Sequence, residues 1–288
     1  MQNGSFILRS MQPGDIESAM KLSEAEGWNQ TKKDWQLFLE DDGNICIVAE
    51  SGSKVVATTT AINYSNQVAW IGMVLVNKAF RGRGISQSLL TSVIEKLERC
   101  KSIKLDATPQ GQQVYKKLGF EDEYLIARMT ISSMKDFSLA TNKSSFPKLI
   151  HNNDHPQVIA LDENSFGANR MQLIGSLLRE FPAKAWMLKQ NNTITGFALG
   201  RDGSRFHHIG PVVASTVEDA RLLLATALKK LIGQPVAVDV LSDKEDLISW
   251  LNSIGFTKQR HFTRMYKKDN PFPGLPSRQY LICGPEFG

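Results

Sequence analysis

The residues best suited to chemistry lie between positions 74 and 86. Three apolar residues, Val74-Leu75-Val76, precede a turn and then the run Arg81-Gly82-Arg83-Gly84-Ile85-Ser86. This pattern predicts a strand that passes through a glycine-containing turn into a helix. The first N–H groups of a helix lack internal partners and form an anion site with the positive end of the helix dipole. The glycines allow close approach of the backbone, and the two arginines add donors suited to phosphate oxygens.

An ordinary strand-to-helix turn with basic residues facing water would give the same local pattern, so the wider context matters. Arg81-x-x-Gly84-x-Ser86 resembles the R/Q-x-x-G-x-G/A motif of GNAT acetyltransferases, with Ser86 where the family has Gly or Ala. Tyr115-x-x-Leu118-Gly119-Phe120 resembles a second signature of that family, and Thr108 stands where the family usually has Asn. The early Gly27-Trp28-Asn29 and the stretch before the tyrosine resemble a tandem-GNAT subgroup.

The resemblance implies that the chain binds acetyl-CoA as acyl donor. The backbone of Val74, Leu75 and Val76 would pair with the pantetheine arm. The loop from Arg81 through Gly82, Arg83, Gly84 and Ile85 to Ser86 would hold the pyrophosphate. Tyr115 would protonate the departing thiolate, and a phenol with a reference pKa of about 10 is a suitable acid for that step. The alternative for Tyr115 is a helix tyrosine packed in the core.

The base and the acceptor site are less well marked. Asp106 ends a predicted buried strand and is a candidate base, or else a cap or turn residue. Glu24 and Glu26 lie at the end of the first helix, beside Trp28, in the region where this family lines its acceptor site; the alternatives are a solvated helix end for the glutamates and a core position for the tryptophan. His207-His208 lies on a predicted strand, where at most one side chain would face a site. No histidine pair has metal-ligand spacing, so no metal is expected.

The elements expected around these residues form an α/β fold, a mixed sheet with a meander and crossovers. In the first half we expect strands at 6–10, 45–49, 55–62, 68–76, 103–106 and 124–131, the last closing the sheet, and helices at 13–25, 32–39, up to 97, and 110–118. In the second half we expect helices at 161–180, 217–231 and 247–253, and strands at 185–188, 194–199, up to 213, 236–241, 261–266 and 279–283.

The two halves repeat each other at an offset of 136 residues. Leu118-Gly119-Phe120 recurs as Ile254-Gly255-Phe256, Arg128-Met129 recurs as Arg264-Met265, and Leu105 falls on Leu241. So long a period indicates two domains rather than a solenoid. We therefore predict two tandem GNAT-like domains, residues 1–134 and 148–288, joined by a linker at 135–147 that contains Asn142-Lys143-Ser144-Ser145.

The second half keeps the scaffold and loses the cofactor site. No glycine occurs between Gly210 and Gly233, and the helix there starts with Ser215-Thr216-Val217-Glu218-Asp219. Acidic residues suit a helix start but repel a pyrophosphate. At the repeat offset, Tyr115 falls on Leu251. We expect this domain to bind no CoA and to form a wall of the acceptor pocket or a packing partner.

Composition narrows the class of protein. The chain has 288 residues, of which 42% are hydrophobic, enough for packed cores. Three widely spaced cysteines form no paired framework, which favours reduced thiols in a cytoplasmic protein. The N-terminus shows no signal sequence, and no apolar stretch approaches the ~20 residues of a membrane helix. The net charge of +5 favours an anionic ligand, but no nucleic-acid motif accompanies it.

These observations predict an enzyme that transfers acetyl from acetyl-CoA to a primary amine of a small molecule. Two alternatives stay open: an acyl-CoA-binding or regulatory module without turnover, and a protein-lysine acetyltransferase with an open acceptor groove. Neither nucleic acid nor membrane is expected as a partner. The sequence names neither the amine nor the oligomeric state.

Overall fold

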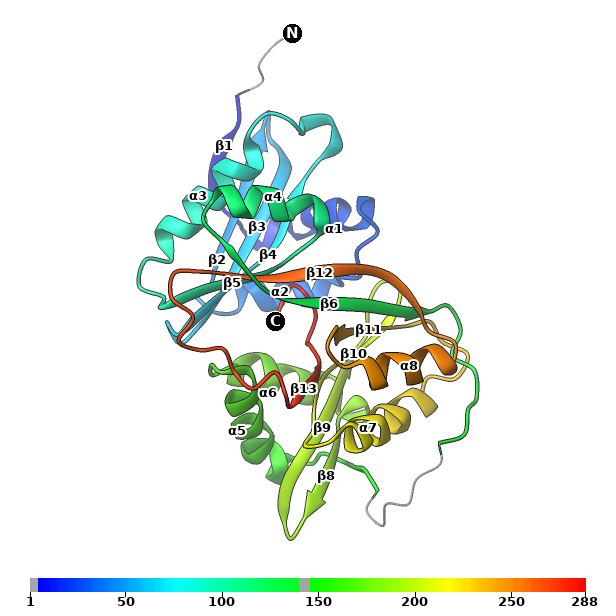
Figure 1. Cartoon of the computed structure of the whole chain (residues 1–288). Helices are drawn as coiled ribbons and strands as arrows, with labels where there is room; N and C mark the ends of the chain where they lie inside the picture. Colours follow the sequence, from blue (N-terminus) through cyan, green and yellow to red (C-terminus); the bar gives the residue numbers. More distant parts are fainter. Residues whose placement is uncertain (1–4, 140–145) are drawn as a thin grey trace.

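The computed structural model describes residues 5–139 and 146–288 (Figure 1). The predicted linker residues 142–145 therefore lie outside the described residues. The first half contains, in chain order, β1 (Ile7–Ser10), a 3-10 turn η1 (Pro13–Asp15), α1 (Ile16–Ala25), α2 (Lys32–Leu39), β2 (Ile45–Ser51), β3 (Lys54–Tyr64), β4 (Val68–Val76), η2 (Lys78–Phe80), α3 (Ile85–Lys96), β5 (Ser102–Ala107), α4 (Pro109–Lys117) and β6 (Glu121–Ile131).

The second half repeats this order of helices and strands and adds further elements. It contains β7 (Lys148–Leu149), η3 (Asn152–Asp154), α5 (His155–Phe166), α6 (Met171–Glu180), η4 (Pro182–Lys184), β8 (Trp186–Gln190), β9 (Thr193–Arg201), β10 (His207–Val213), α7 (Val217–Lys229), β11 (Val236–Leu241), α8 (Glu245–Ser253), β12 (Thr257–Lys267) and β13 (Gln279–Leu281).

Local chemistry fixes several helix starts. Thr31 caps α2 through the backbone N–H of Asp34, whose carboxylate in turn accepts from the Thr31 N–H. Thr108 caps α4, with Pro109 at the first helical position, as its sequence predicts. The single helix expected over 161–180 is wrong. Gly167 takes a left-handed φ of 97° and ends α5, so two helices form.

The described strands form one sheet in the order β1-β2-β3-β4-β5-β12-β6-β11-β13-β10-β9-β8-β7. Strand β12 of the second half lies between β5 and β6 of the first, and β6 pairs in turn with β11 of the second half. The expectation that residues 124–131 close the sheet of their own half is therefore wrong. The two halves exchange their corresponding strands, which cross the middle of the molecule in Figure 1.

The repeat register agrees with this exchange. At an offset of 136, α4 falls on α8 and β6 falls on β12, end to end. Strands β5 and β11 are shifted against that register, so the match of Leu105 with Leu241 does not hold structurally. The ladder partners show the true equivalence: Asp106 faces Arg264, and Asp239 faces Arg128.

These facing residues form two reciprocal ion pairs between the halves. Arg264 donates to both carboxylate oxygens of Asp106, at 2.9 and 3.0 Å. Arg128 does the same to Asp239, at 2.8 and 2.7 Å. All four side chains are almost inaccessible to water. Removing one partner of such a buried pair leaves a charge uncompensated at a cost of about 3–5 kcal/mol, and each pair joins a strand of one half to a strand of the other.

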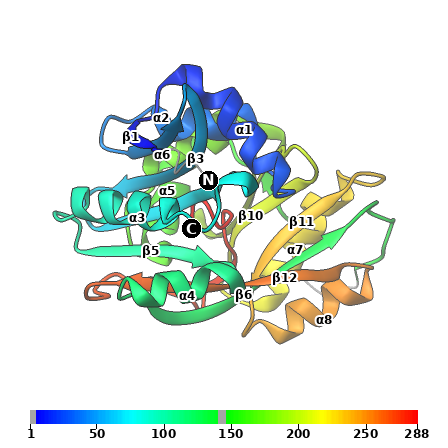
Figure 2. The ribbon, with the colours of Figure 1, turned by 90° about the horizontal axis from the view of Figure 1, so that it is seen from above.

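Residues 279–288 run through the centre of the molecule, between the halves (Figures 1 and 2). Strands β10 and β11 pair directly over three residues, and β13 then separates them. Beyond it, Trp70 Nε1 donates to the Pro285 carbonyl at 2.9 Å, and the Tyr64 hydroxyl donates to the Phe287 carbonyl at 2.8 Å. The Phe287 ring also stacks on Phe38. This segment is therefore part of the core of both halves.

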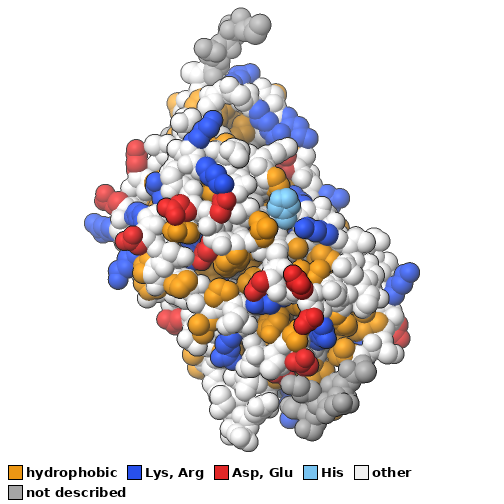
Figure 3. Space-filling view, viewed as in Figure 1, with side chains coloured by type: hydrophobic (Ala, Val, Ile, Leu, Met, Phe, Trp, Pro, Cys, Tyr) orange, Lys and Arg blue, Asp and Glu red, His pale blue; other side chains and the backbone are white. Residues whose placement is uncertain are grey.

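Charged side chains of both signs are interspersed on the face shown in Figure 3, and apolar side chains gather across its middle, where the halves meet. On that face, the excess positive charge forms no continuous basic surface of the kind that binds nucleic acid. Within residues 5–139 and 146–288, no helix is both long and apolar enough to span a membrane.

Candidate active site

An opening between β4 and β5 holds a cavity of about 670 Å³. The two strands pair only from Val68 to Trp70, opposite Ser102 to Lys104, and then separate. Beyond this point β4 contains an irregularity, since the register with β3 shifts near Thr58 and Met73 has a φ of 51°. The Thr58 hydroxyl donates to the Met73 carbonyl at 2.8 Å and fixes this bend. Strand residues 74–76 consequently line the cavity without a partner on β5.

The glycine loop lies at one end of this cavity. Gly82 and Gly84 have φ values of 76° and 75°, a left-handed conformation that favours glycine. Gly84 precedes α3, and no side chain caps that helix. Gly82, Gly84, Ile85 and Ser86 line the cavity, so free N–H groups and the positive end of the helix dipole face a space that an anion can fill.

The two arginines of the loop differ. Arg81 lines the cavity, where its Nη2 donates to Glu26 Oε1 at 2.6 Å and its Nε to the Val76 carbonyl. Arg83, expected to bind the cofactor, is not among the cavity-lining residues. Its guanidinium donates to the Ala79 carbonyl and lies 4.8 Å from the Phe80 ring centre. These two contacts hold the guanidinium away from the cavity. The backbone therefore supplies more of this anion site than the cationic side chains do.

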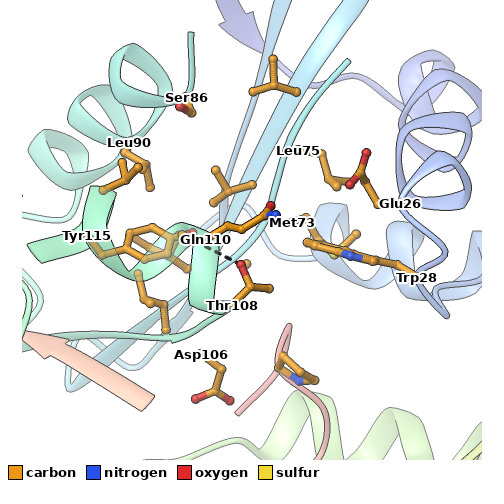
Figure 4. Close-up of a pocket in the computed structure, with 18 of the residues that line it drawn as sticks. Glu26, Trp28, Met73, Leu75, Ser86, Leu90, Asp106, Thr108, Gln110 and Tyr115 are labelled. Atoms are coloured by element: carbon orange, nitrogen blue, oxygen red, sulfur yellow. Dashed lines mark hydrogen bonds between the residues drawn. The ribbon is translucent and has the colours of Figure 1, made fainter. Parts of the chain in front are cut away.

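Tyr115 lies across the cavity from Trp28 (Figure 4). Its ring packs edge-on against Phe120, with ring centres 5.9 Å apart. Gly111 makes room for it, because an added Cβ there would lie 2.9 Å from Tyr115 Cε2. None of the described residues hydrogen-bonds the hydroxyl. Burial raises the pKa of Tyr115, so the phenol keeps its proton throughout the neutral range.

Asp106 lies at the cavity wall, but its carboxyl group points away from Tyr115 (Figure 4). Both of its oxygens are bonded to Arg264, which also donates to the Tyr124 hydroxyl at 2.6 Å. Burial raises the pKa of Asp106, and the Arg264 guanidinium opposes that shift. This geometry favours a role in holding β12 against β5 over the expected role as a base.

Of the residues expected at the acceptor site, some line the cavity and others do not. Glu26 and Trp28 line the cavity (Figure 4). Glu24 is exposed and lies outside the lining, because it sits on the solvent side of the end of α1. His207 and His208 both lie outside the lining; the buried His208 bonds Asp239 at 3.0 Å, and His207 lies 2.9 Å from Asp202. Among the residues that the structure describes, no group of side chains is arranged to hold a metal ion.

Sequence reasoning missed the far wall of the cavity. That wall consists of residues from the exchanged strands and the segment after β13: Arg128, Arg260, Phe262, Pro285 and Glu286. Gly72 lets this segment lie against β4, since an added Cβ would be 3.1 Å from Glu286 Cα. The recurrence of Arg128-Met129 as Arg264-Met265 was a signal for this wall, but it marks equivalent strands without showing that they are exchanged.

Glu286 lies against Gly72 of β4, two residues beyond the point where β4 and β5 separate. It accepts a hydrogen bond from Arg201, whose guanidinium also donates to Asp34 at 2.7 Å. Burial opposes its ionisation, but Arg201 and Arg128 outweigh burial and hold the pKa of Glu286 below its usual value. The cavity therefore has an anion-binding end at the glycine loop and a charged end built by both halves.

Comparisons with known proteins agree with this geometry. A model of the acetyltransferase (GNAT) family matches residues 15–120, and a model of an acetyltransferase (GNAT) domain matches residues 158–281. The chain therefore belongs to the GNAT superfamily, with two domains of that fold, and is an acyltransferase. The models match both halves, including the one that lacks the glycine loop.

Individual relatives cover nearly the whole chain. A holothin acyltransferase of Pseudoalteromonas sp. (strain SANK 73390) is 23% identical over 283 residues, which are 96% of this chain and 93% of that protein. A solved structure from Pyrococcus horikoshii has a TM-score of 0.80 at 23% identity and covers 100% of this chain and 97% of its own. A tandem GNAT protein from the clavulanic acid biosynthesis pathway has a TM-score of 0.62 at 12% identity, covering 91% and 98%. At these identities the two structures show the fold alone.

Proposed function

We propose that the chain transfers an acetyl group from acetyl-CoA to a primary amine of a small molecule. The observation that carries the proposal is the opening between β4 and β5. It joins an unpaired strand edge at 74–76, free N–H groups at Gly84 to Ser86, and the unbonded hydroxyl of Tyr115 in one cavity. The strand edge matches an extended amide-bearing arm, the N–H groups match a pyrophosphate, and the hydroxyl matches a departing thiolate.

The reaction needs one bond to form and one to break. The neutral amine nitrogen attacks the thioester carbon, and the C–S bond then breaks. Tyr115 gives its proton to the departing sulfur, and the raised pKa of this phenol keeps that proton available. The amine nitrogen loses its extra proton to water in the cavity. Glu286, close to the separation of the strands, would attract the amine and orient it.

Both halves contribute to the acceptor end, and this favours a small acceptor over a protein lysine. The segment with Pro285 and Glu286 and the strand with Arg260 and Phe262 line the cavity together with Trp28. A protein side chain would need an open groove there. The relative from Pseudoalteromonas is named for holothin and not for a protein substrate, which agrees with this proposal.

A cytoplasmic location and a division into domains at 1–134 and 148–288 belong to the same proposal. All three cysteines are free and buried, as suits a reducing compartment. The division follows the repeat, although the exchanged strands mean that each unit includes one strand from the other.

The test is a screen of primary amines with acetyl-CoA that follows the release of free CoA. We expect release that depends on one class of small amine, with the acetylated amine as product. Release with protein lysines alone would contradict the small-molecule acceptor. Tight binding of acetyl-CoA with no release for any amine would favour the binding module without turnover.

A further inference from the structure

The acceptor end of the cavity contains a charged side chain with no partner of opposite charge. Six charged residues line the cavity: Glu26, Arg81, Asp106, Arg128, Arg260 and Glu286. Each of the three carboxylates is bonded to an arginine, and Arg128 is bonded to Asp239. Within the described part of the chain, Arg260 alone of the six has no ion pair. Its one side-chain bond goes to the neutral Gln259, at 3.2 Å.

The position of Arg260 makes this lack of a partner costly. The register of β12 against β6 shifts between Lys258 and Arg260, and this bulge sets Arg260 directly opposite Arg128. Like charges that face each other across two strands destabilise a sheet. The Phe262 ring lies close to both guanidinium groups, 5.3 Å from that of Arg128 and 5.8 Å from that of Arg260.

The charges around Arg260 also leave its guanidinium without compensation. Burial and the nearby Arg128 and Arg205 lower the pKa of Arg260, and Asp239 only partly offsets them. Arg205, which lies outside the cavity lining, donates to the Gly27 carbonyl and also has no carboxylate partner among the described residues. In the free protein this end of the cavity thus holds a cation that an anion would stabilise.

From these contacts we infer that Arg260 binds a carboxylate of the acceptor, so that the acceptor is an amino acid in the broad sense, an amine that also carries a carboxylate. The inference rests on the proposed amine acetyltransfer and names its substrate class. Arg260 brings a single unpaired positive charge into the cavity lining, which matches one carboxylate, whereas a phosphate monoester would bring nearly two negative charges. The planar guanidinium also suits two parallel bonds to a carboxylate.

A second residue of the lining supports a ligand with a hydrogen-bond donor. Gln30 is buried, and its Oε1 atom has no hydrogen-bond partner among the described residues. Buried polar atoms in native proteins are nearly always bonded. The amine of such an acceptor supplies donors, while its carboxylate supplies the acceptor oxygens that Arg260 lacks.

The experiment uses linear amino acids with different spacers between amine and carboxylate, each paired with its carboxamide. The amide keeps size and polarity but removes the charge. With the unmodified enzyme, kcat/KM for the best acid should exceed that for its amide by about 10- to 100-fold, the range of a hydrogen bond to a charged group. In Arg260→Gln this preference should disappear, chiefly through a higher KM for the acid, so that acid and amide react with similar kcat/KM.

The matched control is Arg99→Gln, which removes the same charge from an exposed arginine outside the cavity and should keep the preference. Thermal unfolding of both variants checks that they fold. Equal rates for acids and amides with the unmodified enzyme, or a preference that survives in Arg260→Gln, would overturn the inference and leave amine acetyltransfer intact.

If no amine leads to release of CoA, the proposed function is overturned instead. Binding then decides the inference separately, by calorimetric titration of the CoA complex with each acid and amide. Tighter binding of acids that is lost in Arg260→Gln supports the carboxylate site, and equal binding of acids and amides excludes it.

Discussion

The two halves contain the same pair of diverging strands and use it in opposite ways. In the first half β4 and β5 pair over three residues and then separate around an open cavity. In the second half β10 and β11 pair from His207 to Ile209, opposite Val236 to Val238, and β13 then enters between them. A GNAT opening is thus a space that either a ligand or another strand can fill.

The helix that follows each opening shows the same contrast. Gly84 leaves the first turn of α3 without a side-chain cap, whereas Thr216 caps α7 through the Asp219 N–H. Glu218 and Asp219 then add negative charge where a pyrophosphate would need positive charge. The second half has therefore lost both the space and the anion site, and it contributes walls to the cavity of the first half.

The largest expected effect is on turnover at the open cavity of the first half, between β4 and β5. Tyr115→Phe removes only the hydroxyl, so we expect kcat to fall by about 100- to 10,000-fold while the dissociation constant for acetyl-CoA stays nearly the same. Single-turnover rates and calorimetry measure the two quantities. Tyr266→Phe is the control, because its hydroxyl bonds Glu121 outside the cavity. Unchanged rates in Tyr115→Phe would return this residue to a packing role.

The opening between β10 and β11, which β13 fills, should matter for stability and not for cofactor binding. Leu281 of β13 is fully buried between β10 and β11, so Leu281→Ala should lower the free energy of unfolding by about 2–5 kcal/mol. The stoichiometry of acetyl-CoA should remain near one per chain. Leu275→Ala makes the same change at a residue that is 39% exposed and should cost far less. A second CoA site in Leu281→Ala would mean that β13 alone closes the opening.

The glycine loop gives the third test. Gly84→Asp adds a side chain and a negative charge where the pyrophosphate would lie, and we expect acetyl-CoA binding to weaken by about 100-fold or more. Gly233→Asp is the matched control, since Gly233 has a similar φ of 80° and equally open surroundings in the other half. Both variants carry the same backbone strain. Equal loss of binding in the two would assign the effect to strain and remove the loop from the site.

The features of the two halves that the sequence predicts are those that depend on local chemistry. Strand β4 and helices α2 and α4 follow from periodicity and capping residues, and the loss of the second anion site follows from Glu218 and Asp219. Two GNAT domains follow from two signatures and a repeat. Each of these features depends on residues that are close together in the chain, where spacing and structure are directly linked.

The features that the sequence does not predict depend on distant contacts. The exchange of β6 and β12 leaves both strand patterns unchanged, because each still has two neighbours of similar apolarity. The ion pairs that join the exchanged strands link residues far apart in the chain: Asp106 and Arg264 are separated by 158 positions, and Arg128 and Asp239 by 111. Glu286 belongs to no local motif, so its place in the cavity follows only from the path of residues 279–288.

The smallest expected effect concerns the two reciprocal ion pairs, which differ by one residue. Asp239 accepts from His208 as well as from Arg128, whereas Asp106 has no histidine neighbour among its bonded partners. Burial lowers the pKa of His208, and its Nδ1 has no hydrogen-bond partner among the described residues, so a second ring proton would be unsatisfied. In the folded protein this imidazole therefore stays neutral to a lower pH than in the unfolded chain.

A depressed pKa in the folded state gives stability that is present above the unfolded pKa of about 6.5 and is lost as the pH falls below it. Between pH 7.5 and 5 the unmodified protein should therefore lose about 1–2 kcal/mol more of its unfolding free energy than His208→Gln, in which the amide can still donate to Asp239 without titrating. Urea unfolding across this range measures both slopes. Parallel slopes would show that His208 is not the titrating group, and the two ion pairs would then respond alike to acid.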